Sequence, residues 1–279
     1  MHEISFKLPH INLSALEFGD ASKPLVVALH GWLDNAASFI PLAPFLTDYH
    51  LIALDMAGHG LSQHRSPDAN YHLVDWVQDL HQLLELNQWS EVILLGHSLG
   101  GIVASMYASC FPERVSKLVV MESFGPLSKE VESSPQQLRD SIVSRLEVDS
   151  KPARHPATLR QAVQARKVAG DVSTEAARLL VSRNLDDSSG ELRWRTDRRL
   201  RTISSMRVTE DQAKAFMHAI KAPMLVILGQ NGFEKLKVNF QHRQQWVTNL
   251  TSCTCPGGHH LHMEHPFAVG EKIVQFINC

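Results

Sequence analysis

The chain of 279 residues is long enough to bury one large core, with room for a lid or an inserted subdomain. Apolar residues make up 44% of it and charged residues 20%, as in ordinary soluble globular proteins, and the formal net charge is -2. A charge this close to zero excludes a protein that binds nucleic acid or a membrane surface by bulk attraction, and no apolar run approaches the ~18 residues of a membrane span.

The N-terminal segment and the cysteines predict the compartment. Residues 1–10 read MHEISFKLPH, without a basic start and a following apolar stretch, so we expect no signal peptide. Four cysteines are too few for a disulfide scaffold in a chain of this size, and we expect a reducing, cytoplasmic setting. The closely spaced Cys253 and Cys255 could bind a metal ion, but no second pair lies nearby, so we predict no metal site there.

Short apolar runs alternate with longer amphipathic stretches over much of the chain. Five runs, rich in Val, Ile and Leu and each followed by a glycine-bearing or polar turn, predict strands at residues 25–29, 51–54, 92–95, 118–121 and 224–228. A helical period of apolar residues predicts helices at 71–86 and 101–111, the second ended by Pro112. This alternation predicts an α/β fold with a mostly parallel central sheet flanked by helices.

The pattern changes between residues 124 and 218. This segment has no convincing buried strand, and it shows helical spacing at 135–146, 158–169 and 174–183. It carries 17 basic and 13 acidic side chains, whereas the rest of the chain carries 10 and 16. Because a strand pattern returns at 224 and no flexible linker flanks the segment, we interpret 1–123 and 219–279 as one core and 124–218 as an inserted helical cap rather than a second domain.

The strongest chemical signal is the sequence GHSLGG at residues 96–101, between a predicted strand and a predicted helix. GxSxG in this context is typical of a nucleophile elbow, a sharp turn that exposes a serine above the sheet. Gly96 and Gly100 avoid side-chain clashes around the turn, and Gly101 lets the helix pack closely. Ser98 is therefore the predicted nucleophile, and it needs a base, an orienting acid and an oxyanion hole.

The base is expected on a loop after the last core strand, where residues 257–266 read GGHHLHMEHP. The sequence resembles the α/β-hydrolase-fold enzymes in this loop, in the GHSLGG segment, in the HGW of residues 30–32 and in the DMAGHGLS of residues 55–62. The resemblance covers nearly the whole chain outside the predicted cap. It implies that fold, and it assigns the base to His259, which directly follows the glycine of the loop.

The other histidines of this loop have alternative interpretations. His262 is the second candidate for the base. His259, His260, His262 and His265 could also bind zinc together with Glu264. Because the family position already explains His259, we predict a site without metal or other cofactor.

The acid departs from the commonest family pattern, which places Asp soon after the strand predicted at 224–228. Residues 229–232 read GQNG there and hold no carboxylate. The chain is similar to the haloalkane dehalogenases in an alternative position, just after the strand that follows the elbow helix, where Glu122 lies. The resemblance implies that Glu122 orients His259. A solvated carboxylate at a strand end is the other interpretation of Glu122, and Glu234 is the second candidate for the acid.

The nucleophile limits the reaction. Dehalogenases and epoxide hydrolases of this fold use Asp where this chain has Ser98, and a serine cannot form the ester intermediate of those reactions. The reactions still open to a serine nucleophile are the hydrolysis of an acyl bond and the hydrolysis of a carbon–carbon bond in a diketone. The oxyanion hole is expected to use the backbone N–H of Leu99 and, by family analogy, that of Trp32, whose side chain could instead form a pocket wall. His30 and residues 55–62 are interpreted as structural.

The predicted cap contains the run RWRTDRRLR at residues 193–201, with five arginines and one aspartate. This run, the cap and the histidine-rich loop are similar to the serine hydrolase-like subfamily. The arginines could bind a carboxylate or phosphate of a substrate, but we favour a solvated, partly paired surface. A nucleic-acid surface needs a basic stripe with aromatic platforms, which one Trp in an acidic protein does not provide.

These residues predict a serine hydrolase that cleaves a small carboxylic ester through a Ser98–His259–Glu122 triad and an acyl-enzyme. The alternative enzyme is a carbon–carbon bond (diketone) hydrolase. The alternative outside enzymes is a ligand-binding or signalling protein on the same fold with weak hydrolysis. We expect a small-molecule substrate, no nucleic-acid or membrane partner, and a monomer or homodimer.

Overall fold

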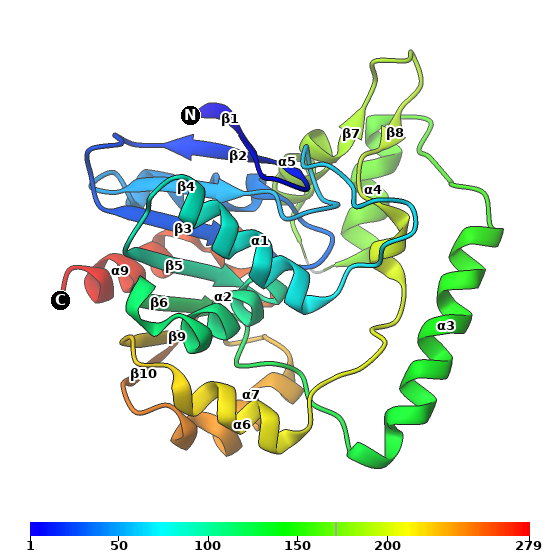
Figure 1. Ribbon diagram of the computed structural model, residues 1–279. Coiled ribbons are helices and arrows are strands. Elements are labelled where there is room, and N and C mark those ends of the chain that lie inside the picture. Colours follow the sequence, from blue (N-terminus) through cyan, green and yellow to red (C-terminus); the bar gives the residue numbers. More distant parts are fainter. Residues whose placement is uncertain (171) are drawn as a thin grey trace.

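One eight-stranded sheet organises the computed structural model, which describes residues 1–170 and 172–279 (Figure 1). In spatial order its strands are β1 (His2–Lys7), β2 (Asn12–Phe18), β4 (His50–Leu54), β3 (Leu25–Leu29), β5 (Val92–His97), β6 (Val115–Met121), β9 (Met224–Gly229) and β10 (Leu250–Cys255). The strands from β4 to β10 run parallel, and β1 and β2 pair antiparallel. The carboxyl ends of the parallel strands therefore meet at one edge of the sheet.

All five predicted strands are present. Strands β4, β5 and β9 are buried at every residue, which explains their near-continuous apolar runs, because a strand covered on both faces has no polar side. The sequence did not predict β1, β2 and β10. These strands lie at or near the sheet edges and keep several exposed residues, so they lack a continuous apolar run.

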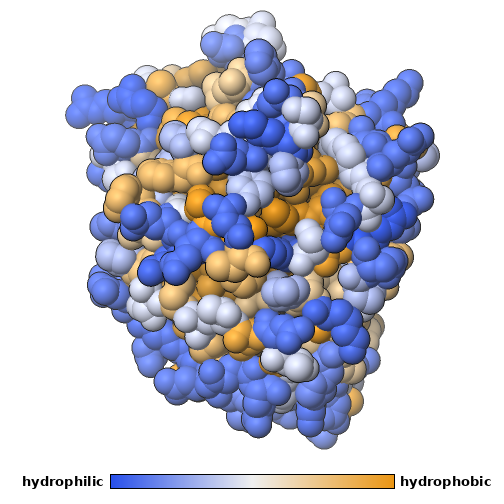
Figure 2. Space-filling view, turned by 90° about the vertical axis from the view of Figure 1, so that its left-hand side faces the viewer, coloured by the Kyte–Doolittle hydropathy of each residue, from blue (hydrophilic) through white to orange (hydrophobic). Residues whose placement is uncertain are grey.

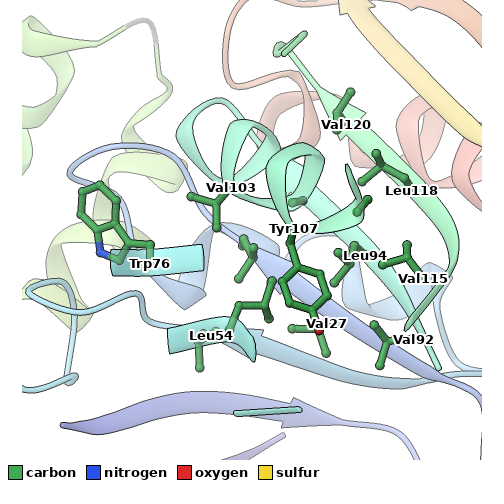
Figure 3. Packing of buried hydrophobic residues seen from close by; sticks show 14 of the residues in the cluster. Val27, Leu54, Trp76, Val92, Leu94, Val103, Tyr107, Val115, Leu118 and Val120 are labelled. Carbon is green, nitrogen blue, oxygen red and sulfur yellow. The ribbon is translucent and has the colours of Figure 1, made fainter. Parts of the chain in front are cut away.

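Helices cover both faces of the sheet. α1 (Leu73–Leu86), α2 (Leu99–Cys110) and α6 (Glu210–Ala219) pack on one face, where Figure 3 shows Tyr107 of α2 lying among Val27, Leu94 and Val92 of the strands. α9 (Pro266–Ile277) and the short helix η1 (Ala36–Phe39) pack on the other face. The remaining helices of the core are α7 (Glu234–Arg243), α8 (Leu261–Glu264), η2 (Ala43–Phe45), η3 (Pro112–Arg114) and η6 (Gln244–Trp246).

A mostly helical insertion lies between β6 and α6. It contains η4 (Val131–Ser133), α3 (Ser134–Ser150), α4 (Leu159–Ala169), α5 (Thr174–Asn184), β7 (Leu185–Asp186), β8 (Arg193–Trp194) and η5 (Arg198–Arg201). Its three long helices form where the sequence predicts them. α4 and α5 share a small apolar core with Met263 of α8, whereas α3 stands apart from the sheet, beyond the carboxyl ends of the strands (Figure 1).

The predicted boundary of the insertion at residue 218 falls inside α6. Ala213 and Met217 of this helix lie in the same apolar cluster as Tyr107 of α2, so α6 packs as part of the core. Thr209 accepts a hydrogen bond from the N–H of Gln212 and caps the start of the helix. By its packing, the insertion ends near residue 208. The sequence did not separate α6 from the insertion because core and surface helices share the same amphipathic period.

The opposite side of the molecule carries both chain termini and the amino ends of the parallel strands (Figure 1). Figure 2 shows this face: hydrophilic residues form most of its rim, and apolar residues appear near its middle. Among the described residues, none of the helices combines the length and the apolar character that crossing a bilayer requires. The predicted nucleophile Ser98 and the predicted base His259 lie at the carboxyl ends of the strands, on the side of the molecule where the insertion contacts the core.

Candidate active site

Ser98 lies at the sharp turn between β5 and α2. Its φ of 50° and ψ of -115° are a strained conformation for a residue with a side chain, of the kind that costs about 1–3 kcal/mol. Backbone crowding explains the neighbouring glycines: a Cβ at Gly100 would lie 2.0 Å from the carbonyl oxygen of Leu29, and one at Gly96 would lie 2.6 Å from that of Gly100. The turn leaves Ser98 partly exposed in the wall of a cavity.

His259 follows β10 and lines the same cavity as Ser98. Its Nδ1 lies 3.3 Å from Oε2 of Glu122, its backbone carbonyl accepts a 2.7 Å hydrogen bond from Nε2 of His97, and Phe233 stacks on its ring with centroids 4.3 Å apart. When Nδ1–H donates to Glu122, Nε2 carries the lone pair that a general base needs. Within the described residues, the hydroxyl of Ser98 makes no hydrogen bond, to His259 or to any other group.

Glu122 lies at the end of β6, and its carboxylate contacts the loop after β9, where the sequence has no carboxylate of its own. It is 3% exposed and accepts hydrogen bonds from the N–H groups of Gly229 at 2.7 Å and Phe233 at 3.4 Å. A Cβ at Gly232 would lie 2.3 Å from Oε1 of Glu122. The loop of residues 229–232 therefore supplies backbone donors and room for a carboxylate that comes from another strand.

The structure brings Glu122, and not Glu234, to His259. The side chain of Glu234 is 83% exposed, and Lys237 lies 3.9 Å from it as an ion-pair partner. Glu122 also has a φ of 49°, in the left-handed region that side chains rarely adopt. Ser98 and the cavity-lining Leu33 share this feature, and the sequence carries no signal for it at Glu122.

The expected oxyanion donors face no competing acceptor. Among the described residues, the backbone N–H groups of Leu99 and Trp32 donate no hydrogen bond. The loop that carries Trp32 is held by His30, whose ring donates to the carbonyl of Gly31 at 2.7 Å and accepts from the N–H of Met56 at 3.0 Å. This arrangement agrees with the structural role expected for His30. The Trp32 side chain itself bonds to the insertion, through a 2.8 Å hydrogen bond to the carbonyl of Leu200.

His262 does not line the cavity. It is fully buried, and its ring lies 4.2 Å from that of His97 and 5.7 Å from that of Phe39. Burial lowers its pKa to about 3, so the ring is neutral at ordinary pH. Neither ring nitrogen has a hydrogen-bond partner among the described residues. Of the two histidines considered for the base, only His259 lines the cavity that Ser98 also lines.

The histidines of residues 259–265 are not arranged as a zinc site. Residues 1–170 and 172–279 contain no group of three or more His, Cys, Asp or Glu side chains placed to hold a metal ion. Cys253 and Cys255 both lie on β10, and burial raises the pKa of the Cys253 thiol to about 11, which disfavours the thiolate that a metal would need.

Asp34 forms a buried ion pair that the sequence did not predict. One carboxylate oxygen accepts from Nη2 of Arg166, in α4 of the insertion, at 2.7 Å, and the other lies 3.1 Å from Nε2 of His260. Burial alone would raise the pKa of Asp34, but His260 and Arg166 outweigh it and hold the pKa well below its usual range. No local motif marks these residues, because Asp34 and Arg166 lie in different elements and meet only in the fold.

The cavity between the insertion and the strand ends has a volume of about 1510 Å³. Trp32, Phe233 and Trp194 contribute aromatic side chains to its wall, and the predicted nucleophile Ser98 and the predicted base His259 also line it. A cavity of this size is larger than the ~300–1,000 Å³ typical of small-molecule sites, so it has room for a substrate longer than a minimal ester.

The arginine run of residues 193–201 divides between the surface and the cavity. Arg193 pairs with Glu191 at 3.4 Å, Arg195 pairs with Asp186 at 2.9 Å, and Arg199 pairs with Asp197 at 2.6 Å. Arg193 and Arg195 fit the expected solvated or paired surface, and Arg199 is paired although it also lines the cavity. Arg198 and Arg201 do not fit it, because both line the cavity and neither has an acidic partner among the described residues.

Comparisons with known proteins agree with this geometry. Residues 24–266 match the family model described as "alpha/beta hydrolase fold". The human "Serine hydrolase-like protein 2" is 30% identical over 99% of this chain and 94% of its own length. A hypothetical protein, PA1622, from Pseudomonas aeruginosa PAO1 has a similar solved structure, with a TM-score of 0.94, 36% identity and coverage of 100% of this chain and 99% of that one. A thioesterase domain from the curacin biosynthetic pathway shares the fold at 22% identity, with a TM-score of 0.86 and 99% coverage of both chains.

Proposed function

The chain belongs to the α/β-hydrolase fold family, and from this membership we propose that it hydrolyses an acyl bond through Ser98, His259 and Glu122. One observation carries the proposal. Ser98 occupies a strained elbow in the wall of the cavity that also exposes His259, and Nδ1 of His259 lies 3.3 Å from the buried carboxylate of Glu122. The family alone does not specify this chemistry, because the same fold hosts other reactions.

In the proposed reaction, the hydroxyl oxygen of Ser98 attacks the acyl carbon and its proton moves to Nε2 of His259. The developing negative charge on the acyl oxygen is stabilised by the N–H groups of Leu99 and Trp32. Glu122 keeps the imidazole oriented and stabilises its protonated form. His259 then gives its proton to the leaving group, which departs as an alcohol or thiol.

In the second half, His259 takes a proton from a water molecule that attacks the acyl-enzyme. The acid is released and the proton returns to Ser98. A carboxylic ester is the proposed substrate class, since a serine nucleophile with backbone oxyanion donors suits acyl transfer. The retained Glu122 argues against a purely ligand-binding role, which would not need an acid beside His259.

The test is to treat the purified protein with a fluorophosphonate probe and to map the adduct by mass spectrometry. We expect a fast adduct on Ser98, because an activated serine reacts and an ordinary serine does not. Ser98→Ala should abolish both the adduct and the turnover of esters while the circular dichroism spectrum and the unfolding midpoint stay close to those of the wild type.

A folded Ser98→Ala protein with full ester turnover would contradict the proposal. So would an adduct on another residue together with unaltered labelling in Ser98→Ala. Parallel panels of esters, thioesters and diketones separate acyl hydrolysis from carbon–carbon bond hydrolysis, because only the diketone hydrolase would cleave diketones faster than esters.

A further inference from the structure

The wall of the cavity carries an excess of positive charge. Of the described residues that line it, six are basic and three are acidic: Lys151, Arg154, Arg166, Arg198, Arg199 and Arg201 against Asp34, Asp149 and Asp197. Asp34 pairs with Arg166 and Asp197 pairs with Arg199. Lys151 pairs with Glu147 at 2.9 Å, outside the lining. Three guanidinium groups, of Arg154, Arg198 and Arg201, therefore face the cavity against the single carboxylate of Asp149.

The backbone of η5 aligns two of these groups. In a 3-10 helix the side chains at positions i and i+3 lie directly above each other. Arg198 and Arg201 have this spacing, and both line the cavity. The two residues between them point elsewhere: Arg199 bonds to Asp197 and to backbone carbonyls of residues 65–69, and Leu200 is buried in the main apolar core.

The position of η5 is held by the core. The indole of Trp32 donates a 2.8 Å hydrogen bond to the carbonyl of Leu200, and the N–H of Asp197 donates to the carbonyl of Gly58 at 2.9 Å. The segment that carries Arg198 and Arg201 is therefore bonded to the loop with the expected oxyanion donor, and both arginines line the same cavity as Ser98. The guanidinium of Arg198 donates only to the carbonyl of Lys151, and the side chain of Arg201 has no hydrogen-bond or ion-pair partner within residues 1–170 and 172–279.

We propose that Arg198 and Arg201 bind an anionic oxygen group of the substrate, a carboxylate or a phosphate, while its acyl carbon lies at Ser98. The proposal rests on the function proposed above and specifies its substrate class. Two guanidinium groups side by side repel each other, and an anion bound between them relieves this repulsion and accepts their hydrogen bonds. An excess of positive charge in a cavity wall also concentrates anionic ligands before they bind. Arg154 lines the same cavity and adds to this attraction.

The test compares two pairs of substrates, and in each pair one member is neutral and the other carries an additional anionic group. The carboxylate pair is 4-nitrophenyl butyrate and the 4-nitrophenyl monoester of glutaric acid. The phosphate pair is the butyryl thioester of N-acetylcysteamine and butyryl-coenzyme A. For each pair the ratio of kcat/KM, anionic over neutral, is measured in the wild type and in Arg198→Gln/Arg201→Gln. We expect at least one ratio to fall about tenfold or more in the double variant, and to fall with added salt in the wild type.

The matched control is Arg193→Gln/Arg207→Gln. It removes the same two charges, but both residues are exposed and lie outside the cavity lining. We expect it to leave both ratios close to those of the wild type. A fall confined to the glutarate ester assigns a carboxylate, and a fall confined to the coenzyme A thioester assigns a phosphate. Unchanged ratios in Arg198→Gln/Arg201→Gln, an equal loss for neutral and anionic substrates, or an equal fall in the control would overturn the proposal.

Binding without turnover separates this proposal from the proposed function. Ser98→Ala should bind glutarate or coenzyme A in a calorimetric titration, and the additional changes Arg198→Gln/Arg201→Gln should remove that binding. If the wild type forms no fluorophosphonate adduct and hydrolyses nothing, but this binding is present, the proposed function fails and the anion site stands. If Ser98 is labelled and neutral esters are hydrolysed, but neither anion binds, the anion site fails and the proposed function stands.

Discussion

At the scale of single residues, the distinctive feature is the origin of the carboxylate that lies beside His259. Glu122 comes from the end of β6, and the loop of residues 229–232 after β9 donates a backbone N–H to it instead of carrying its own carboxylate. The contact between the Glu122 carboxylate and this loop depends on Gly232, because any Cβ there would lie 2.3 Å from Oε1 of Glu122. Gly232 does not have a positive φ, so the absence of a side chain, and not backbone freedom, is what the site requires.

We predict that Gly232→Ala lowers kcat for esters while the protein stays folded. The added methyl group should displace the Glu122 carboxylate and weaken its contact with His259. Removing the charge itself in Glu122→Gln sets the upper limit, which is about a ten-thousandfold loss if Glu122 acts like the orienting acid of other serine triads. Steady-state kinetics with a chromogenic ester, together with the unfolding midpoint of each variant, measure both effects.

Glu234→Gln is the control for this prediction. Its carboxylate is exposed and makes no contact with His259 among the described residues, so the variant should keep the activity of the wild type. If Glu234→Gln loses activity and Glu122→Gln keeps it, the acid is assigned to the wrong residue. If Gly232→Ala is as active as the wild type, the short distance between residue 232 and the Glu122 carboxylate does not matter for activity, and the prediction is wrong.

At the scale of elements, several polar contacts fasten the inner part of the insertion to the core. Arg166 of α4 pairs with Asp34 at 2.7 Å, and Arg183 of α5 pairs with Asp55 at 2.8 Å. The amide of Asn35 donates to the carbonyl of Leu180, also in α5. α3 differs from these helices, because its apolar side chains are solvent-exposed: Leu138 at 47%, Ile142 at 52% and Leu146 at 64%. The cavity wall from α4 to η5 is therefore bonded to the core, whereas α3 contributes a wall whose apolar side chains face solvent.

We predict that Arg166→Gln destabilises the fold by roughly 3 kcal/mol, because it leaves the buried carboxylate of Asp34 without its cationic partner. Asp34→Asn in the same protein should recover part of this loss, since the charge that needs the partner is gone. Urea unfolding of the wild type, both single variants and the double variant gives the coupling free energy between the two residues.

Arg160→Gln provides the matched control on the same helix. Arg160 is exposed and has no side-chain partner among the described residues, so its replacement should change the unfolding midpoint little. A coupling free energy near zero between Asp34 and Arg166 would mean that the pair does not hold α4 on the core.

At the scale of the whole molecule, the buried histidines determine how stability depends on pH. His30, His59, His97 and His262 are completely buried, and burial lowers the pKa of each: to about 4 for His30, to about 3 for His59 and His262, and well below its usual range for His97. In the unfolded chain the same groups titrate near 6.5. Below that pH the unfolded state therefore binds more protons than the folded state, and stability falls.

We predict that the free energy of unfolding is constant above about pH 7 and decreases as the pH falls from 6.5 toward 4, by on the order of 1 kcal/mol per pH unit for each buried histidine. The decrease should therefore begin above the range in which carboxylates titrate. Urea unfolding curves at a series of pH values measure the slope.

His262→Leu should reduce this slope, because it removes one buried proton-binding group that has no hydrogen-bond partner among the described residues. His2→Gln is the control, because His2 is exposed at the edge of the sheet. A stability that stays flat down to pH 5, or an equal change of slope in both variants, would contradict the role of the buried histidines.

The sequence by itself determined the five apolar strands, the three insertion helices and the elbow at Ser98. These features are local: the period of the apolar residues and the spacing of the glycines carry them over a few turns of chain. The same local patterns did not predict β1, β2 and β10, because these strands keep exposed residues and have no continuous apolar run. The boundary predicted for the insertion fell inside α6, because this helix has the same apolar period as any amphipathic helix.

Only the tertiary structure decided which of the candidate groups meet. It brought Glu122 rather than Glu234 to His259, buried His262 away from the cavity and joined Asp34 to Arg166. It also divided one arginine run into residues with an acidic partner and two cavity-lining residues without one among the described residues. The catalytic roles of Ser98, His259, Glu122, Leu99 and Trp32 stay predictions. The physical reason for the division is that charge pairing, burial and free donors depend on contacts between elements a hundred residues apart, which no local pattern records.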